Sequence, residues 1–258
     1  METYEVRDIL RRIYLRGTER TSRNQTYMEL DYFQGIIDNP WSMYPSRKYN
    51  IDYFKREFQW YLGADPYDHR IAKFAKMWGK IIQPDGQIFS NYGFYWFGPQ
   101  KGMEWVIDTL HKDPDSRQAY IPMCNYNHIY RGNPDVVCTK GIQFKIRNGI
   151  YLDMHVSMRS SDAIYGLGTD LPCFYFLWMM IASELCMREG RFVFSADSVH
   201  VYKKHYGMME RIVKNNETSI PPVHPFIDDA DDLIFGRYES DFGKWLREVN
   251  LDEEDNQR

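Results

Sequence analysis

The chain has 258 residues, of which 43% are hydrophobic and 16% aromatic, and its formal net charge is -4. This length and composition predict one domain with a single large core over residues 1–258. The slight negative charge argues against direct binding of nucleic acid, which needs a broad basic face. The longest apolar run, residues 171–182, is too short to span a bilayer, so we expect no membrane partner.

The cysteine content indicates neither a disulfide framework nor a metal site. No two cysteines have the C-x-x-C spacing typical of zinc or dithiol sites, so we expect no metal: they are Cys124, Cys138, Cys173 and Cys186. The first residues lack the basic and apolar segments of a secretion leader. Reduced thiols in a cytoplasm are therefore the simplest interpretation.

The N-terminal pattern predicts a helix, a loop and a strand. Apolar residues at helical spacing indicate an amphipathic helix over residues 6–14, which Gly17 ends. Residues 17–25 are a predicted polar loop that carries Arg23, and residues 26–33 alternate as a strand. A loop arginine is usually solvated, but a loop is also where a mobile phosphate clamp would lie.

Glu57 lies on the next predicted helix, over residues 51–62 with Asn50 as its N-cap. The residues alone favour an outer-face glutamate paired with Lys55 or Arg56. The alternative is a carboxyl at a pocket wall, where burial raises the pKa into a range useful for proton transfer.

The middle of the chain alternates between short predicted elements and one clear hairpin. The short elements are a helix over 71–81 that includes Trp78, a turn at 90–93 that includes Tyr92, a helix over 103–110, and a strand from Arg117 to Cys124. In residues 141–159, apolar and polar residues alternate on both sides of Asn148-Gly149, the strongest short hairpin signal. The mixed polar face of this hairpin could pair with another subunit.

Three further elements are predicted: a buried helix over 172–188, a short strand over 191–195, and a helix that follows residues 197–202 and runs through Lys214. His200 and Tyr202 are two residues apart, so they share one side of an extended segment. Strands and helices interleave without a repeated βαβ unit or a Gly-rich phosphate loop. The predicted fold class is therefore α+β.

The junction between the hairpin and the buried helix reads Met158-Arg-Ser-Ser-Asp-Ala-Ile-Tyr-Gly-Leu-Gly-Thr-Asp170. Arg159 is a forked, permanently charged donor suited to phosphate, and Ser160 and Ser161 add short donors. A string of this kind is more often a solvated loop with a surface ion pair. Taken alone, it leaves both interpretations open.

Several separated motifs in order resemble the thymidylate synthase family, and within it most closely the phage deoxycytidylate hydroxymethylases. The likeness covers roughly residues 57–206, with a weaker match at the N-terminal loop. It rests on Ser90-Asn-Tyr-Gly, Asp113-Pro-Asp-Ser-Arg117, Cys138-Thr139, Met158-Arg-Ser and Val199-His-Val-Tyr202. The resemblance implies a mixed β-sheet covered by helices on one face, with its other face at a homodimer interface.

The resemblance also implies an activity: a one-carbon unit from 5,10-methylenetetrahydrofolate, as co-substrate, is transferred to C5 of dCMP, and water completes the reaction. A phage-encoded enzyme of this kind would work in the host cytoplasm. Cys138 would be the nucleophile that adds to C6 of the pyrimidine, activated by cationic neighbours such as Arg159 that lower a thiol's pKa. Glu57 would organise proton transfer and water, and would border the folate.

The other implied roles concern binding. The nucleotide would be bound by Arg159, Ser160 and Ser161, together with Arg23 from the loop and Arg117 from the partner subunit. The sugar hydroxyl would be reached by His200 and Tyr202, and the base would be bordered by Tyr92, which is part of the catalytic set. The folate would be faced by Asp162 and Trp78.

Asp170 is the most informative departure from the synthases, which have asparagine there. Cytosine that is protonated at N3 presents two hydrogen-bond donors, and a carboxylate can accept from both. Uracil presents O4 instead, which is an acceptor and would be repelled by the carboxylate oxygens. A buried site built on such a bond can discriminate by roughly 10⁴ or more. The alternative is that Asp170 serves as the N-cap of the following helix.

Other departures keep alternative functions open. Thr139 replaces the histidine of synthases, and Gln118 replaces a usual second arginine, which weakens the phosphate clamp unless another cation compensates. The acidic residues 251–258, predicted to be loose, do not match the apolar tail that closes over folate in synthases. The alternatives are a thymidylate synthase or dCMP methylase, and a non-catalytic member that binds a nucleotide or a partner.

Overall fold

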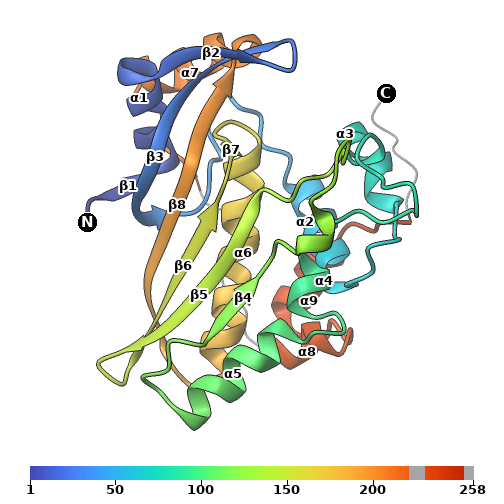
Figure 1. Ribbon diagram of the computed structural model, residues 1–258. Coiled ribbons are helices and arrows are strands. Elements are labelled where there is room, and N and C mark those ends of the chain that lie inside the picture. Colours follow the sequence, from blue (N-terminus) through green and yellow to red (C-terminus); the bar gives the residue numbers. More distant parts are fainter. Residues whose placement is uncertain (221–229, 253–258) are drawn as a thin grey trace.

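The computed structural model describes residues 1–220 and 230–252 of the chain (Figure 1). In these residues an eight-stranded mixed sheet has the order β1-β3-β8-β6-β5-β4, with β2 paired to β3 and β7 to β8. The α+β class is confirmed. The strands are β1 Thr3–Glu5, β2 Thr18–Ser22, β3 Gln25–Asn39, β4 Tyr120–Pro122, β5 Thr139–Arg147, β6 Tyr151–Met158, β7 Ser161–Asp162 and β8 Arg188–Tyr202.

Helices cover the sheet, and α6 runs along it behind β5 and β6 (Figure 1). Alternate residues of β6, from Leu152 to Met158, are buried, as expected for a sheet with one face against a helical layer. The described helices are α1 Val6–Arg16, α2 Ile51–Leu62, α3 Lys76–Gly79, α4 Tyr92–Trp96, α5 Gly102–Lys112, α6 Gly166–Glu184, α7 Tyr206–Lys214, α8 Ala230–Ile234 and α9 Asp241–Leu246, with short 3₁₀ turns η1 Arg70–Lys73, η2 Tyr126–His128 and η3 Lys203–His205.

The central helix α6 begins six residues before its predicted start at Pro172. Proline is favoured in the first turn of a helix, which explains why the pattern predicts that start. The helix instead accommodates Pro172 in its interior, where its apolar residues are buried on all sides. As a consequence Asp170 lies inside the helix, and Tyr165 is at the N-cap position. The N-cap interpretation of Asp170 is wrong.

Long-range pairing lengthens the strands beyond the sequence pattern. The predicted loop 17–25 is the hairpin of β2 and β3, whose turn residues Arg23 and Asn24 both have positive φ. The predicted strand 191–195 is one part of β8, which pairs with β3 from Tyr27↔Tyr202 to Ile36↔Val193. These partners supply the backbone hydrogen bonds that local periodicity does not report.

The predicted short elements are confirmed only in part. Asn50 caps α2 by accepting from the Tyr53 amide at 3.0 Å, and the hairpin of β5 and β6 forms as expected. The predicted helix 71–81 divides into η1 and α3, and the strand from 117 to 124 shortens to β4. The predicted turn at 90–93 is instead the start of α4. No helix in the described part of the chain is long and apolar enough to cross a membrane.

Candidate active site

The ends of four strands meet at one end of the sheet, close to β7 (Figure 1). Thr139 at the start of β5 pairs with Met158 at the end of β6, so Cys138 and Arg159 are neighbours. Asp162 of β7 pairs with His200 of β8, and the Ala163 amide donates to the His200 carbonyl at 2.7 Å. Sheet register therefore gathers residues that lie more than 60 positions apart in sequence.

Arg159 lies against the candidate nucleophile. Its Nη2 is 3.5 Å from Cys138 Sγ, and its amide donates to the Cys138 carbonyl at 2.8 Å. The guanidinium also donates to the carbonyls of Val136 and Val137, which fix its orientation. The arginine is half-buried, so the interpretation of this string as a solvated surface ion pair does not hold.

The Cys138 thiol has a raised pKa in the free protein. Burial is the largest cause, and the charges of Asp170 and Asp135 add to it. Arg159 and Arg23 oppose the rise, which is the direction predicted for Arg159, but they do not outweigh burial. A neutral thiol beside a fixed cation is therefore the resting arrangement.

Glu57 is buried on the inner face of α2, so its prediction as an outer-face glutamate is wrong. It accepts a hydrogen bond from Tyr61 Oη at 2.8 Å, and the Tyr53 phenol, one turn earlier on α2, also acts to lower its pKa. Burial outweighs both effects and raises the pKa of Glu57 to about 7. Lys55, one expected partner, pairs instead with Glu248.

Asp170 is a second carboxyl on the opposing helix α6. Among the described residues, no hydrogen bond or ion pair reaches its carboxylate. Burial, followed by the charges of Glu57 and Asp162, raises its pKa well above the ordinary value. A Cβ atom at Gly166 would lie 3.6 Å from both Asp170 Oδ2 and Ser161 Oγ, so these two polar groups face the same space beside the glycine.

Aromatic rings form a wall next to the two carboxyls. Tyr92 stacks on Tyr61 at 5.3 Å between ring centroids and on Phe174 at 5.7 Å. Trp78 is buried, packs on Trp60, and donates its indole N–H to Tyr53 Oη at 2.8 Å. The predicted residues Tyr92 and Trp78 therefore belong to the aromatic cluster that lies next to Glu57.

Several buried polar atoms near this end of the sheet have no hydrogen-bond partner among the described residues. They are Thr139 Oγ1, Ser161 Oγ and His200 Nδ1. Buried polar groups are normally satisfied, so unsatisfied ones indicate a ligand or water. Burial lowers the pKa of His200, which keeps the ring neutral, while the adjacent Asp162 opposes this effect.

Tyr202 and Arg23 lie at the edge of this group. The Tyr202 ring packs edge-on to His200 at 4.8 Å, so the two share one side of β8 as predicted. Arg23, exposed in the β2–β3 turn, lowers the pKa of both Cys138 and Tyr202 through its charge, although burial raises each of them overall. Ser160 follows Arg159 and is half-buried.

Arg117 is the predicted site residue that lies apart. It is exposed before β4, and β4 pairs with β5 from Gln143 to Gly141, further along the strand than Cys138. No hydrogen bond or ion pair in the described residues joins Arg117 to the other predicted site residues. Its assignment to a partner's site remains a prediction.

Three features near the site were missed. Arg47 is buried, donates to Ser42 Oγ at 2.8 Å, and has an Nε without a partner among the described residues. Tyr53 and Tyr61 flank Glu57 at a spacing of four, a helical signal present in the sequence. The segment up to residue 252, expected to be loose from residue 251, is held on α2 and by the Arg70–Asp252 ion pair; residues 253–258 lie outside the described residues.

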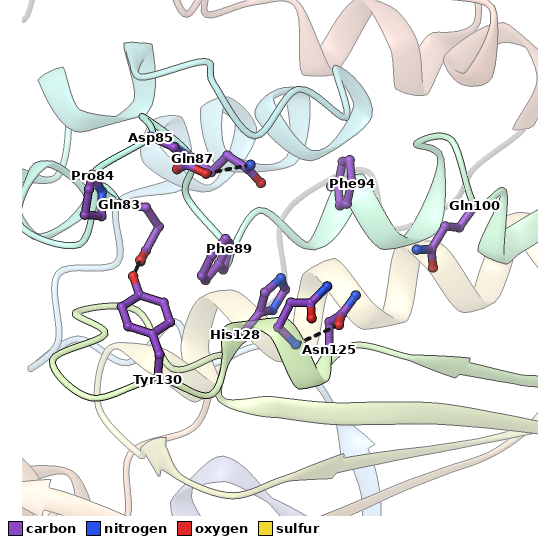
Figure 2. Close-up of a pocket in the computed structure, with 11 residues that line it drawn as sticks. Gln83, Pro84, Asp85, Gln87, Phe89, Phe94, Gln100, Asn125, His128 and Tyr130 are labelled. Atoms are coloured by element: carbon purple, nitrogen blue, oxygen red, sulfur yellow. Dashed lines mark hydrogen bonds between the residues drawn. The ribbon is translucent and has the colours of Figure 1, made fainter.

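A cavity of about 490 Å³ lies away from the residues just described (Figure 2). Figure 2 shows Gln83, Phe89, His128 and Tyr130 on its wall, and none of the predicted site residues lines it. The Phe89 and His128 rings stack at 3.8 Å there. Within the described residues, no three His, Cys, Asp or Glu side chains are placed to hold a metal ion.

The thymidylate synthase family model matches residues 4–242. The chain therefore belongs to the thymidylate synthase family. Membership implies a folate-dependent one-carbon transferase that acts on a pyrimidine nucleotide and uses methylenetetrahydrofolate.

Three curated relatives carry one name. The chain is 25% identical over 185 residues to the deoxycytidylate 5-hydroxymethyltransferases of Enterobacteria phages T4, T6 and T2. The alignment covers 66% of this chain and 75% of each relative.

Proposed function

We propose that the chain is a deoxycytidylate 5-hydroxymethyltransferase, which converts dCMP to 5-hydroxymethyl-dCMP. The observation that carries this proposal is Asp170, a carboxyl without a hydrogen-bond or ion-pair partner among the described residues, which lies beside Gly166 together with Ser161 Oγ, a buried polar atom that also lacks a partner there. Its raised pKa lets it hold a proton that it can pass to N3 of cytosine. The resulting carboxylate then accepts from both N3–H and the C4 amino group.

Cys138 supplies the covalent step. Its sulfur bonds to C6 of the ring, and Arg159 at 3.5 Å stabilises the thiolate that this step requires. Charge that develops on the ring is taken up by the N3 proton from Asp170, and C5 becomes nucleophilic. C5 bonds to the one-carbon unit and loses its own hydrogen as a proton. Elimination of the sulfur at the end restores the aromatic ring, and the departing thiolate takes up a proton to become the thiol again.

The nucleotide phosphate is assigned to Arg159, Ser160 and Arg23, with Arg117 of a second subunit completing the set. The sugar hydroxyl is assigned to His200, whose buried Nδ1 needs a partner, and to Tyr202 beside it. Ser161 Oγ, which also lacks a partner among the described residues, can bind the nucleotide within the same space. Tyr92 borders the base.

The donor of the one-carbon unit is methylenetetrahydrofolate, which supplies carbon at the oxidation level of formaldehyde. The residues present fit its polar ring, because Asp162 can accept further hydrogen bonds in addition to the one that the Ile164 amide donates to it at 2.9 Å. Asp162, Trp78 and Glu57 would hold this co-substrate. Glu57 would move the proton of the water that completes the reaction.

Product analysis tests this function directly. Purified protein is incubated with methylenetetrahydrofolate and either dCMP or dUMP, and nucleotide and folate products are identified by mass spectrometry. We expect 5-hydroxymethyl-dCMP and tetrahydrofolate from dCMP. Dihydrofolate with a methylated nucleotide would instead identify a synthase or a dCMP methylase.

Two controls separate catalysis from binding alone. Cys138→Ser should lower turnover by at least about 10⁴-fold, as removal of a nucleophile commonly does. Cys124→Ser, which changes an exposed free cysteine, should leave turnover unchanged. Tight dCMP binding by the wild type without any product would support the non-catalytic alternative.

The homodimer is tested by mixing inactive subunits. Arg117→Ala and Cys138→Ser subunits should each be inactive alone, whereas a mixed dimer would contain one site with both residues intact. Activity that reappears on mixing supports the exchange of Arg117 between subunits. Monomeric sedimentation at micromolar concentration would contradict it.

A further inference from the structure

Three polar side chains lie in one line on the inner face of α2. Tyr53, Glu57 and Tyr61 are spaced by four residues, so they follow one another along the same face of the helix. Glu57 and Tyr61 are buried, and Tyr53 is partly buried. Tyr61 donates a hydrogen bond to the Glu57 carboxyl at 2.8 Å, and Tyr53, one turn away on the other side, also lowers the pKa of that carboxyl.

Trp78 fixes the direction of one of these hydrogen bonds. An indole N–H can only donate, so at 2.8 Å the Tyr53 oxygen must accept from it. The Tyr53 hydroxyl proton is then free to point at Glu57. Stacking of the Tyr61 ring on Tyr92, with 14° between the planes, fixes the second phenol in a similar way.

No cation faces Glu57 among the described residues that influence its pKa. The titratable groups that surround it are Tyr53 and Tyr61 on its own helix, Tyr49 in the preceding segment, Tyr92 on α4, and Asp170 and Cys173 on α6. Of these, only the two phenols on α2 lower the pKa of Glu57. They are therefore the groups that stabilise its ionised form.

We propose that Tyr53 and Tyr61, the tyrosine pair, are positioning residues that hold the Glu57 carboxylate and keep it able to exchange a proton near neutral pH. This inference rests on the proposed function, in which Glu57 takes a proton from water. In that step the water oxygen bonds to the exocyclic carbon at C5 of the nucleotide, and one water proton passes to Glu57. The π pair of the exocyclic double bond moves into the ring to form the C5–C6 double bond, the C6–S bond breaks, and its electron pair leaves with the Cys138 sulfur.

The direct test measures Glu57 in the protein without any ligand. With ¹³C-labelled glutamate side chains, carboxyl signals are followed by NMR against pH, and Glu57→Gln identifies the signal of interest. Tyr61→Phe should raise the pKa of Glu57 by about one unit, the size expected for one hydrogen bond to a charged group. Tyr53→Phe should raise it similarly, and Trp78→Phe, which leaves both phenols in place, by less.

Tyr49→Phe is the matched control. Its hydroxyl is buried near Glu57 but has no hydrogen-bond partner among the described residues. We expect this variant to leave the Glu57 signal unmoved. An unchanged Glu57 titration in both Tyr53→Phe and Tyr61→Phe would overturn the proposal, and having two variants guards against one that does not fold.

The pH dependence of turnover provides a second readout. Removal of either phenol of the pair should move the acid limb toward higher pH, with a loss of about tenfold near pH 6 that is recovered at alkaline pH. A purely structural role would lower the whole profile without moving it. If the wild type uses dUMP instead of dCMP, the proposed function fails, but the NMR titration still tests the tyrosine pair.

Discussion

Two carboxyl groups with nearly equal burial behave in opposite ways. Asp232, between α8 and α9, is 2% exposed and accepts from Ser240 Oγ at 2.6 Å and from the amides of Glu239 and Ser240. Burial alone would raise its pKa, but these hydrogen bonds outweigh burial and the pKa is lowered. Glu57 is 3% exposed, accepts from Tyr61 Oη at 2.8 Å, and has a pKa raised to about 7.

The difference lies in depth as well as in donors: Glu57 lies deep in the core with no cation beside it among the described residues, whereas Asp232 lies nearer the protein surface, with Arg237 beside it as well as its hydrogen-bond donors. Backbone amides at a helix N-terminus are fixed and favour a permanently ionised carboxylate, which suits Asp232 to hold the start of α9 in place. Glu57 has fewer donors, and Asp170 has none among the described residues, so both can exchange protons. Among these three groups, the carboxyl with several donors has a structural role, and the two with fewer donors belong to the proposed site.

Asp170→Asn should have the largest effect on function. The amide presents a donor to O4 of uracil and removes one acceptor from the amino edge of cytosine. We expect the ratio of kcat/KM for dCMP to that for dUMP to fall by about 10³-fold. The ratio is measured by competition between the two nucleotides, and an unchanged ratio would mean that the ring is read by other residues.

Glu57→Gln should change stability in a pH-dependent way. The pKa of Glu57 rises from 4.5 to about 7 on folding, so the stabilisation of the protonated form is present below about pH 4.5 and lost as pH rises through 7. Above pH 7 the ionised group costs about 3 kcal/mol, which the neutral amide avoids. Urea unfolding of both proteins should show the variant gaining relative to the wild type between about pH 5 and pH 8.

Parallel unfolding curves for wild type and Glu57→Gln would contradict that prediction. They would mean that folding leaves the pKa of Glu57 at its ordinary value despite its burial. The comparison between the two buried carboxyls would then no longer separate a functional group from a structural one.

Asp232→Asn should have the opposite sign. The amide nitrogen would face the donors of Ser240 and Glu239, which leaves at least one buried hydrogen-bonding group unsatisfied. We expect a loss of about 2 kcal/mol in the free energy of unfolding near neutral pH. Nucleotide preference should not change, since Asp232 lies outside the proposed site.

Local signals predicted those parts of the fold whose geometry is set within a few residues. Asn148-Gly149 forms the hairpin turn, with φ of 58° and 67°, and Asn50 caps α2 as expected. The extent of β8 was not predictable, because its hydrogen bonds come from β3, more than 150 positions away. Pro172 similarly suggested a helix start that burial of α6 overrides.

For the candidate site, too, local signals were predictable from the sequence and long-range packing was not. The order of motifs named Cys138, Arg159 and Asp170, but the burial of Glu57 depends on how α2 packs under α4 and α6. Its spacing from Tyr53 and Tyr61 was visible, yet that periodicity does not say which helical face is inner when aromatic residues occur on more than one face. Arg47 gave no local signal, since a single arginine in a polar stretch usually lies in solvent.

Asp153→Asn should have the smallest effect and sharpen the comparison within one sheet. Asp153 is on β6, toward the hairpin end, where Arg147 binds it at 2.9 Å and the Arg191 amide donates to it at 2.8 Å. Both partners are close to solvent, so the pair should contribute about 0.5–1 kcal/mol to stability. Thermal unfolding should show that small loss, with turnover and nucleotide preference unchanged, because a satisfied carboxylate at this end of the sheet has no vacancy for a ligand to fill.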